Sequence, residues 1–345
     1  MTRKRSPLVI PLFIAHQGCP HRCVFCNQES ITGRVQAAMR PVRAPEVTAT
    51  IETWLARAGA YPDREVQVAF YGGSFTGLAR DYQEELLAAV RPYLAQGQVK
   101  AIRLSTRPDR IDPETVTFLK ASGVAVVELG VQAMDDRVLA ASGRGHTVAA
   151  VKDAFRCLQV AGLRVGGQLM IGLPGETTVS ALAGARALAA LAPDFVRIYP
   201  TLVVRGSVLA ERHAVGSYQP FSLPQAVALA ASLKTIFDQH HIPVVRMGLQ
   251  PSASLEQDLL AGPYHPAFGE LVLGRLFFNR VRTLLADIPA GATRILSIAP
   301  ADLSIFRGQK NCSIRRLAAL GLSARMQLHL DPEQPRHTVR LLQSQ

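Results

Sequence analysis

Three cysteines, Cys19, Cys23 and Cys26, lie on one short segment and have the chemistry to bind an inorganic cofactor. Their C-x3-C-x2-C spacing offers three thiolates from a single loop. A [4Fe–4S] cluster normally takes four cysteines, so a cluster held by three keeps one iron free for another ligand. The amino acid end of S-adenosylmethionine (SAM) is the expected ligand. An electron from the cluster would then split a carbon–sulfur bond and release a 5′-deoxyadenosyl radical.

Two other readings of the cysteine segment stay open. A structural zinc site is one, because Cys3His is a common zinc ligand set and His16 or His21 could supply the fourth ligand. A lipoprotein signal is the other, since basic residues and an apolar stretch precede Cys19. Prolines interrupt that stretch, and polar residues occupy the positions before a cleavage site, so the signal is the weaker reading. The spacing favours the cluster.

The composition is that of a folded chain in a reducing compartment. The 345 residues are 48% hydrophobic and 19% charged, enough for a large barrel with a small appendage or for two ordinary domains. Of the five cysteines, Cys157 and Cys312 are isolated, so a disulfide framework is not expected. No uninterrupted apolar run is long enough to span a bilayer. The sequence therefore predicts a cytoplasmic protein without a membrane partner.

Positive charge is concentrated at the two ends of the chain. Residues 1–45 and residues 266–345 each carry a net charge of +6, whereas residues 46–265 have equal numbers of acidic and basic residues. Basic ends on a neutral middle favour a polyanionic partner, and RNA is the expected one. An arginine-rich solvated surface with no partner is the alternative.

Short apolar segments alternate with helical patterns through the first 245 residues, which predicts β-α units around a parallel sheet. The expected strands are Leu8–Ala15, Val66–Tyr71, Ala101–Ser105, Val124–Val131, Arg164–Ile171 and Phe195–Tyr199. The expected helices include Ala44–Ala58, Tyr82–Tyr93, Pro113–Ala121, Val148–Ala161 and Val179–Ala190. Six strands are too few for a closed eight-stranded barrel. The predicted fold class is therefore α/β, a partial (β/α)6 TIM-like barrel with its chemistry at the carboxyl ends of the strands.

A second, smaller α+β domain is expected at the C-terminus. Turn signals between residues 250 and 265 separate a barrel over residues 1–250 from a basic domain over residues 266–345. In this domain a strand, two short helices and a strand surround the turn Gly308-Gln-Lys-Asn311. That order resembles a minimal KH module, whose G-x-x-G turn clamps an RNA backbone. A plain helix-turn-helix is the alternative.

Polar or glycine-rich segments follow three of the expected strands. Gly72-Gly73-Ser74 comes after the second strand, where backbone carbonyls can approach an ammonium group closely. The fourth strand ends with Glu128 and Gln132, which suit ribose hydroxyls and the carboxylate of SAM. Arg144 could pair with that carboxylate in bidentate fashion, although the neighbouring Thr147 could simply cap the next helix. Gly172-Leu-Pro-Gly175, after the fifth strand, fits an adenosine or an ordinary turn equally well.

Together these segments resemble the radical SAM superfamily, and more closely the radical SAM half of the Elongator catalytic subunit. A more distant likeness is to oxygen-independent coproporphyrinogen oxidases. The resemblance covers about Pro11 to Pro251 and rests on six segments. They are Cys19-x3-Cys23-x2-Cys26, Gly72-Gly73-Ser-Phe, Ser105-Thr-Arg-Pro-Asp109, Glu128-Leu-Gly-Val-Gln132, Arg144-Gly-His-Thr147 and Tyr199-Pro-Thr-Leu-Val-Val-Arg-Gly206.

The resemblance implies a role for each matching residue. Cys19, Cys23 and Cys26 would ligate a [4Fe–4S] cluster, and Phe25 would pack near the adenine of SAM. Gly73 and Ser74 would receive the SAM amino group. The remaining family positions that contact SAM would fall on Gln132, Arg144 and Gln168.

Two departures limit what the Elongator likeness implies. That subunit spaces its first two cysteines more widely, and it carries an acetyltransferase domain after the barrel that is not expected in this chain. The predicted activity is therefore that of a radical SAM enzyme supplied by a reducing electron donor, with RNA, most simply tRNA, as substrate. A small-molecule substrate, as for coproporphyrinogen oxidase, and a zinc-stapled RNA-binding protein without catalysis are the alternatives.

Overall fold

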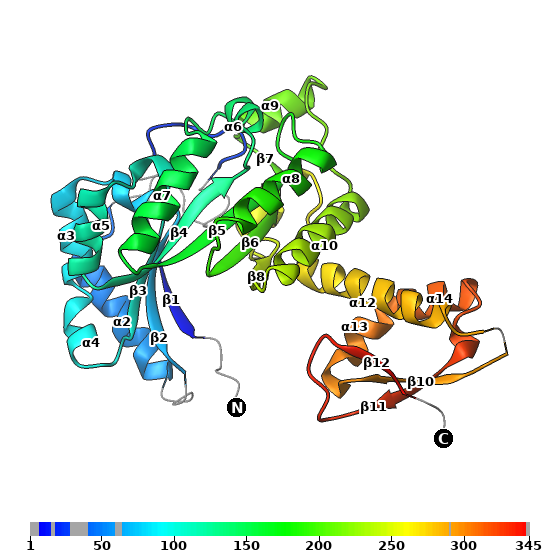
Figure 1. The fold of residues 1–345 in the computed structure, drawn as a ribbon. Helices are drawn as coiled ribbons and strands as arrows, with labels where there is room; N and C mark the ends of the chain where they lie inside the picture. Colours follow the sequence, from blue (N-terminus) through cyan, green and yellow to red (C-terminus); the bar gives the residue numbers. More distant parts are fainter. Residues whose placement is uncertain (1–6, 15–17, 28–40, 59–63, 290, 343–345) are drawn as a thin grey trace.

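A curled parallel sheet dominates the computed structural model of this protein, which describes all residues except 1–6, 15–17, 28–40, 59–63, 290 and 343–345. Figure 1 shows helices along the outer side of this sheet. The arrangement is the predicted partial barrel with a small appended α+β part. No helix of the described residues is both long and apolar enough to cross a membrane.

The large sheet has seven strands, in the order β1-β2-β3-β4-β5-β6-β8, and every neighbouring pair is parallel. Six of them match the predicted strands, and β8 was not predicted. The bounds are β1 Leu8–Phe13, β2 Val66–Tyr71, β3 Ala101–Thr106, β4 Val124–Gln132, β5 Arg164–Ile171, β6 Phe195–Pro200 and β8 Val244–Met247. A four-residue strand with an arginine gives little hydrophobic signal, which explains why β8 was missed.

The helices that join these strands follow the predicted alternation. They are α2 Ala44–Ala58, α3 Arg80–Ala88, α4 Arg91–Ala95, α5 Pro113–Ala121, α6 Asp136–Ala141, α7 Val148–Val160, α8 Thr178–Ala189 and α10 Leu223–Gln239. One predicted helix, Tyr82–Tyr93, is split into α3 and α4. Pro92 lies in the first turn of α4, where a missing N–H costs no helical hydrogen bond, so a new helix begins there.

Short elements lie beyond the carboxyl edge of the sheet. Strands β7 (Val203–Val204) and β9 (Leu259–Ala261) pair antiparallel, and helices α9 (Val208–Ala214) and α11 (Ala253–Asp258) follow β7 and precede β9, respectively. Figure 1 shows α6, α9 and β7 at the same end of the molecule. These elements position the loop that carries the cysteines, as described below.

The C-terminal part is built on a three-stranded sheet in the order β11-β10-β12. Its elements appear in the predicted order: β10 Arg294–Ile298, α13 Leu303–Arg307, α14 Cys312–Ala319, β11 Met326–Leu330 and β12 Val339–Leu342. In the turn between α13 and α14, Lys310 and Asn311 both have left-handed backbone, with φ of 49° and 58°. The domain limits and the likeness to a KH module stay predictions.

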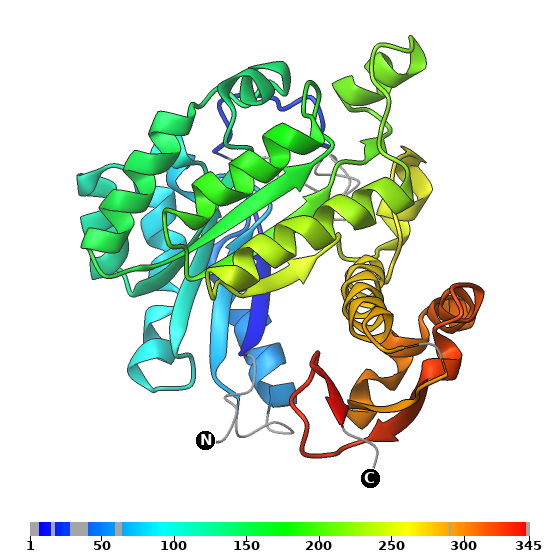
Figure 2. The ribbon, with the colours of Figure 1, turned by 45° about the vertical axis from the view of Figure 1, so that its right-hand side comes forward.

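Helix α12 (Phe268–Ala286) joins the two parts of the chain, as Figure 2 shows. Its first turns contribute Phe268 and Val272 to the core of the large sheet. Its later turns contribute Phe277, Phe278, Val281 and Leu285 to a second core beneath the small sheet. One continuous helix therefore belongs to both hydrophobic cores.

Candidate functional site

The three cysteines lie on the loop that follows β1, at the carboxyl edge of the large sheet. Cys19 is exposed, Cys23 is buried and Cys26 is half-buried. The loop is tied down next to Cys23 by two backbone hydrogen bonds of Val24. Its N–H donates to Ser142 after α6 over 3.1 Å, and its carbonyl accepts from Leu209 of α9 over 2.8 Å.

Side chains of the loop also reach the segment between β7 and α9. The Asn27 amide donates to the carbonyl of Arg205 over 2.6 Å, and the Arg22 guanidinium donates to that of Gly206 over 3.2 Å. This segment belongs to the long motif Tyr199–Gly206 that supported the family resemblance. Its observed role is to hold the cysteine loop through these two hydrogen bonds.

Backbone contacts without side chains fix the start of the loop. Gly18 has a φ of 72°, and a Cβ added there would lie 2.1 Å from the carbonyl oxygen of Ser74. A Cβ added to Gly77 would lie 2.0 Å from the carbonyl oxygen of Gly18. Only glycine permits so close an approach of two backbones. The cysteine loop is therefore seated directly on the turn that follows β2, a contact that the sequence analysis missed.

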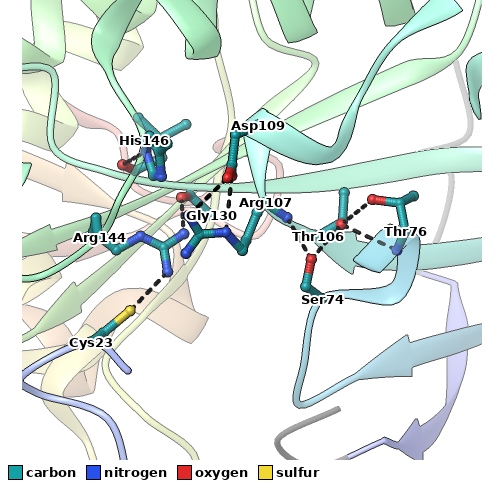
Figure 3. Close-up of polar contacts among 10 residues, drawn as sticks. Cys23, Ser74, Thr76, Thr106, Arg107, Asp109, Gly130, Arg144 and His146 are labelled. Atoms are coloured by element: carbon teal, nitrogen blue, oxygen red, sulfur yellow. Dashed lines mark hydrogen bonds and ion pairs between the residues drawn. The ribbon is translucent and has the colours of Figure 1, made fainter. Parts of the chain in front are cut away.

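The glycine-rich turn after β2 is in turn bound to the end of β3 (Figure 3). The buried Ser74 hydroxyl lies 3.0 Å from the Thr106 hydroxyl, which lies 2.6 Å from that of Thr76. The backbone N–H of Arg107 donates to the Ser74 hydroxyl over 3.4 Å. Gly72 has left-handed backbone, with φ of 90°, which turns the chain away from the strand.

Arg144, which the sequence predicts to contact SAM, lies directly beside the cysteines. One terminal nitrogen, Nη1, donates to Cys23 Sγ over 3.3 Å, and the other donates to the carbonyl of Gly130 over 2.7 Å (Figure 3). Thr147 also caps α7, because its hydroxyl accepts from Ala150 N–H over 3.2 Å. The helix cap is thus confirmed, whereas the pairing of Arg144 with the carboxylate of SAM stays a prediction.

Opposing influences act on the Cys19 thiol. Burial of its sulfur and the neighbouring Cys23 raise its pKa, whereas the positive charges of Arg144 and Arg107 and a backbone hydrogen bond from Ser74 lower it, with a net increase. Positive charge and N–H donors stabilise a thiolate, the form that binds metal. At Cys19, Arg144, Arg107 and the Ser74 backbone therefore offset only part of the increase in pKa that burial and Cys23 cause.

Arg107, Asp109 and His146 complete this end of the barrel, and none of them was among the predicted site residues. Arg107 is 2% exposed and forms a double hydrogen bond with Asp109, over 2.9 Å and 3.0 Å. Burial and the charges of Arg144 and Arg107 lower the pKa of His146 to about 4, so the imidazole is neutral at pH 7. The Arg-Pro-Asp spacing within the quoted motif was the one available sequence signal for the Arg107–Asp109 pair.

Glu128 occupies a different environment, inside the curl of the sheet. Its carboxylate accepts from the Tyr71 hydroxyl over 2.9 Å and pairs with Arg103 and Arg197, whose nitrogens lie 3.3 Å and 2.7 Å away. These partners come from β2, β3 and β6. The predicted role of Glu128 toward ribose stays a prediction with which three protein partners compete.

The remaining predicted residues line the edge between these groups. Gln132 has left-handed backbone, with φ of 65°, and lies within 3.5 Å of the Gln168 amide nitrogen. Phe25, half-buried, packs beside two apolar clusters, one around Leu209 and one around Leu173. The structure therefore brings Gln132 and Gln168 together and places Phe25 within the cysteine loop. Their contacts to SAM stay predictions.

Glu176 provides a pH-dependent feature next to this edge. Its carboxylate accepts from the Gly172 N–H over 2.6 Å. Burial raises its pKa from 4.5 to about 7, although backbone hydrogen bonds from Gly172 and Leu173 oppose the increase. A carboxyl group with a raised pKa favours the folded state only while it is protonated.

We expect the free energy of unfolding to fall as pH rises from about 4.5 to about 7, by at most about 3 kcal/mol from Glu176, because the unfolded chain ionises first. Solvent screening reduces that figure. Glu176→Gln should remove this part of the slope because glutamine does not titrate. Its amide oxygen still accepts the hydrogen bond from the Gly172 N–H. Denaturant unfolding of both proteins at pH 5, 6 and 8 measures the difference, and parallel pH profiles would contradict the assignment.

The residues at the cysteine loop fit an anionic iron–sulfur cofactor. Two buried nitrogens here, Arg107 Nη1 and Arg144 Nε, have no hydrogen-bond partner within the described residues. Buried polar nitrogens without partners are costly, so their presence favours a bound group with acceptor atoms. Thiolates beside two guanidinium groups are a suitable donor set for such a cluster.

A single-ion site is not assembled in the described part of the chain, where no three His, Cys, Asp or Glu side chains gather closely enough to hold one metal ion. In a cluster each cysteine binds a different iron, so the three sulfurs need not converge on one point. His16, one of the two histidines considered for a zinc site, lies outside the described residues.

Two protein-family models match the chain. The model of the Radical SAM superfamily matches residues 13–181, and that of the Radical SAM C-terminal domain matches residues 193–277. The first match includes the cysteine loop and four of the barrel connections. The second begins just before β6 and reaches into α12.

Relatives of established and unknown role resemble the chain at modest identity. A tRNA uridine(34) acetyltransferase of Methanocaldococcus jannaschii is 27% identical over 66% of this chain and 48% of its own length. An uncharacterized protein of the same organism is 26% identical over 82% of this chain and 85% of its own length. The chain thus spans about half the length of the acetyltransferase relative.

A solved structure shares the fold. The archaeal Methanocaldococcus infernus Elp3 with an N-terminal deletion superposes with a TM-score of 0.59 at 22% identity, covering 78% of this chain and 62% of that one.

Proposed function

From the premise that this chain belongs to the radical SAM superfamily and is an enzyme of it, we propose that it acts on RNA, with a tRNA base as the reacting group. The observation that carries the proposal is the similarity to a curated tRNA uridine(34) acetyltransferase, together with a C-terminal part of net charge +6. The acetyl transfer of that relative is not included, because the matched region covers about half of it.

Cofactor binding is assigned to the residues at the carboxyl edge of the sheet. Cys19, Cys23 and Cys26 would hold a [4Fe–4S] cluster. When bound, such a cluster supplies the electron that cleaves SAM to a 5′-deoxyadenosyl radical. For SAM itself we propose the residues predicted from the sequence: Phe25, Gly72, Gly73, Ser74, Glu128, Gln132, Arg144 and Gln168.

The protein's own contribution is to position and shield these groups. Arg144 donates a hydrogen bond to the Gly130 carbonyl and places positive charge at Cys23. Its guanidinium group also offers N–H donors to an anionic ligand. The backbone carbonyl of Ser74 faces the loop because Gly18 and Gly77 allow the two segments to touch.

The basic C-terminal part is proposed as the RNA-binding surface. Around the turn between α13 and α14, the exposed side chains of Arg307, Lys310 and Arg315 form no ion pair with an acidic residue of the described part of the chain. Phosphate contacts of this kind bind RNA without reading its sequence. They would hold the substrate while a base enters the barrel.

We expect the affinity for bulk tRNA to fall steeply with added salt, and Lys310→Ala and Arg315→Ala each to weaken binding and reduce the salt slope by about one. Fluorescence anisotropy over a range of salt concentrations measures both quantities.

Arg156→Ala is the matched control for these variants. Arg156 is an exposed arginine of α7 that lies 2.6 Å from Asp153. Its substitution removes the same charge from a surface that is distant in sequence. If Arg156→Ala weakens binding as much as Lys310→Ala, the C-terminal surface is not the specific interface. If the wild-type protein shows no salt-dependent binding, RNA is not the substrate, and a small-molecule substrate becomes the better reading.

A further inference from the structure

Positive charge is buried in excess beside the cysteine loop. Arg107 and Arg144 are 2% and 7% exposed, and both act electrostatically on Cys19 and on His146. Asp109 is the carboxylate that pairs with Arg107, and His146 is neutral at pH 7. Of these groups, two guanidinium groups carry positive charge and one carboxylate carries negative charge. Figure 3 shows both guanidinium groups between Asp109 and Cys23 in that view.

The Arg107 guanidinium is held rigidly. Nε and Nη2 donate to the two carboxylate oxygens of Asp109. This bidentate pair fixes the orientation of the planar guanidinium group. Its backbone N–H donates to Ser74, on the turn that touches the cysteine loop. The third nitrogen, Nη1, is buried and has no partner in the described part of the structure.

A buried charge with a free nitrogen is costly unless an anion lies near it. Three thiolates on an iron–sulfur core supply net negative charge, which grows when the core gains an electron. A fixed positive charge nearby stabilises the reduced form more than the oxidised form. Local charge and hydrogen bonds to the sulfurs are known determinants of cluster potential.

We propose that Arg107, held by Asp109, is a positioning residue that raises the reduction potential of the cluster bound by the cysteine loop. The inference rests on the proposed function for the presence of that cluster. The role of the Arg107–Asp109 pair is distinct from SAM binding. SAM binding is proposed for Arg144, the arginine that contacts the cysteine loop. An enzyme that must accept an electron from a cellular donor benefits from such a charge.

The test compares three variants of the full-length protein after anaerobic reconstitution, by redox titration followed with electron paramagnetic resonance. Arg107→Gln removes the positive charge, and we expect the reduced-to-oxidised ratio at a fixed applied potential to fall about tenfold, a shift of ~59 mV to lower potential. Arg107→Lys keeps the charge and should stay near wild type. Asp109→Asn removes a negative charge and should move the potential upward.

Opposite signs for Arg107→Gln and Asp109→Asn separate this role from a structural one, because loosening the pair would move both variants in the same direction. An unchanged potential in Arg107→Gln overturns the proposal. If calorimetry then also shows a large loss of SAM affinity in Arg107→Gln, Arg107 is a SAM ligand instead. If Arg107→Gln does not retain iron, the upward shift in Asp109→Asn decides. A wild-type protein that binds no cluster would overturn the proposed function as well.

Discussion

Cys23→Ala is expected to lose the iron–sulfur cluster and to reduce the release of 5′-deoxyadenosine on the order of 100-fold or more. Cys23 is the buried cysteine of the loop and the one that accepts a hydrogen bond from Arg144. With three cysteines available, losing one leaves too few thiolates for a stable cluster. The measurements are iron and sulfide content after anaerobic reconstitution, where wild type should hold about four iron per chain, and 5′-deoxyadenosine formed with dithionite and SAM.

Cys157→Ala is the matched control for this variant. Cys157 is a free, half-buried cysteine of α7 that packs against the main core, away from the loop. It should bind iron and release 5′-deoxyadenosine as wild type does. Iron retained by Cys23→Ala would refute the ligand assignment, and one zinc per wild-type chain in place of iron would favour the zinc-stapled RNA-binding protein.

Gly77→Ala is expected to displace the cysteine loop and to lower cluster loading on the order of tenfold, although Gly77 is not a ligand. The new Cβ would lie 2.0 Å from the carbonyl oxygen of Gly18 and 2.9 Å from its carbonyl carbon, both backbone atoms that cannot rotate away. Overpacking of this kind typically costs about 1–3 kcal/mol. Iron content and thermal unfolding of the reconstituted protein measure the two effects.

Gly274→Ala controls for the substitution of glycine as such. A Cβ at Gly274, within α12, would lie 3.6 Å from the carbonyl oxygen of Ile305, an ordinary contact. Alanine also favours helix over glycine by about 1 kcal/mol, so this variant should be as stable as wild type or slightly more stable. Wild-type loading in Gly77→Ala would mean that the loop does not depend on its contact with the turn after β2.

Much of the fold follows from local patterns in the sequence. Almost all residues of Val66–Tyr71 and Val124–Gln132 are buried, and their apolar runs made these strands predictable. Strand β8 is half-exposed at the sheet edge and was missed for that reason. The break between α3 and α4 was also missed, although Pro92 was a signal for it.

The sequence predicts ligands for the site, which stay a prediction, but it does not predict the contacts that support them. The cysteine spacing identified Cys19, Cys23 and Cys26 from neighbouring positions alone. By contrast, Gly18 and Gly77 are separated by a strand and a helix, so only the folded chain shows that their backbones touch. Glu128 has suitable chemistry for a ligand, but no pattern in the sequence ranks ribose against Arg103 and Arg197 as its partners.

The helix shared by two cores restricts how the length of this chain can vary. One residue inserted in the middle of α12 would turn everything after it by about 100° and advance it by about 1.5 Å. The second core, which includes Phe277, Val281 and Leu285, lies wholly after the insertion and would turn as a unit relative to Phe268 and Val272 in the first core. Insertions and deletions are therefore compatible with the loops on either side of α12 but not with the helix itself, which sets the spacing and rotation between the barrel edge and the basic surface as a fixed unit.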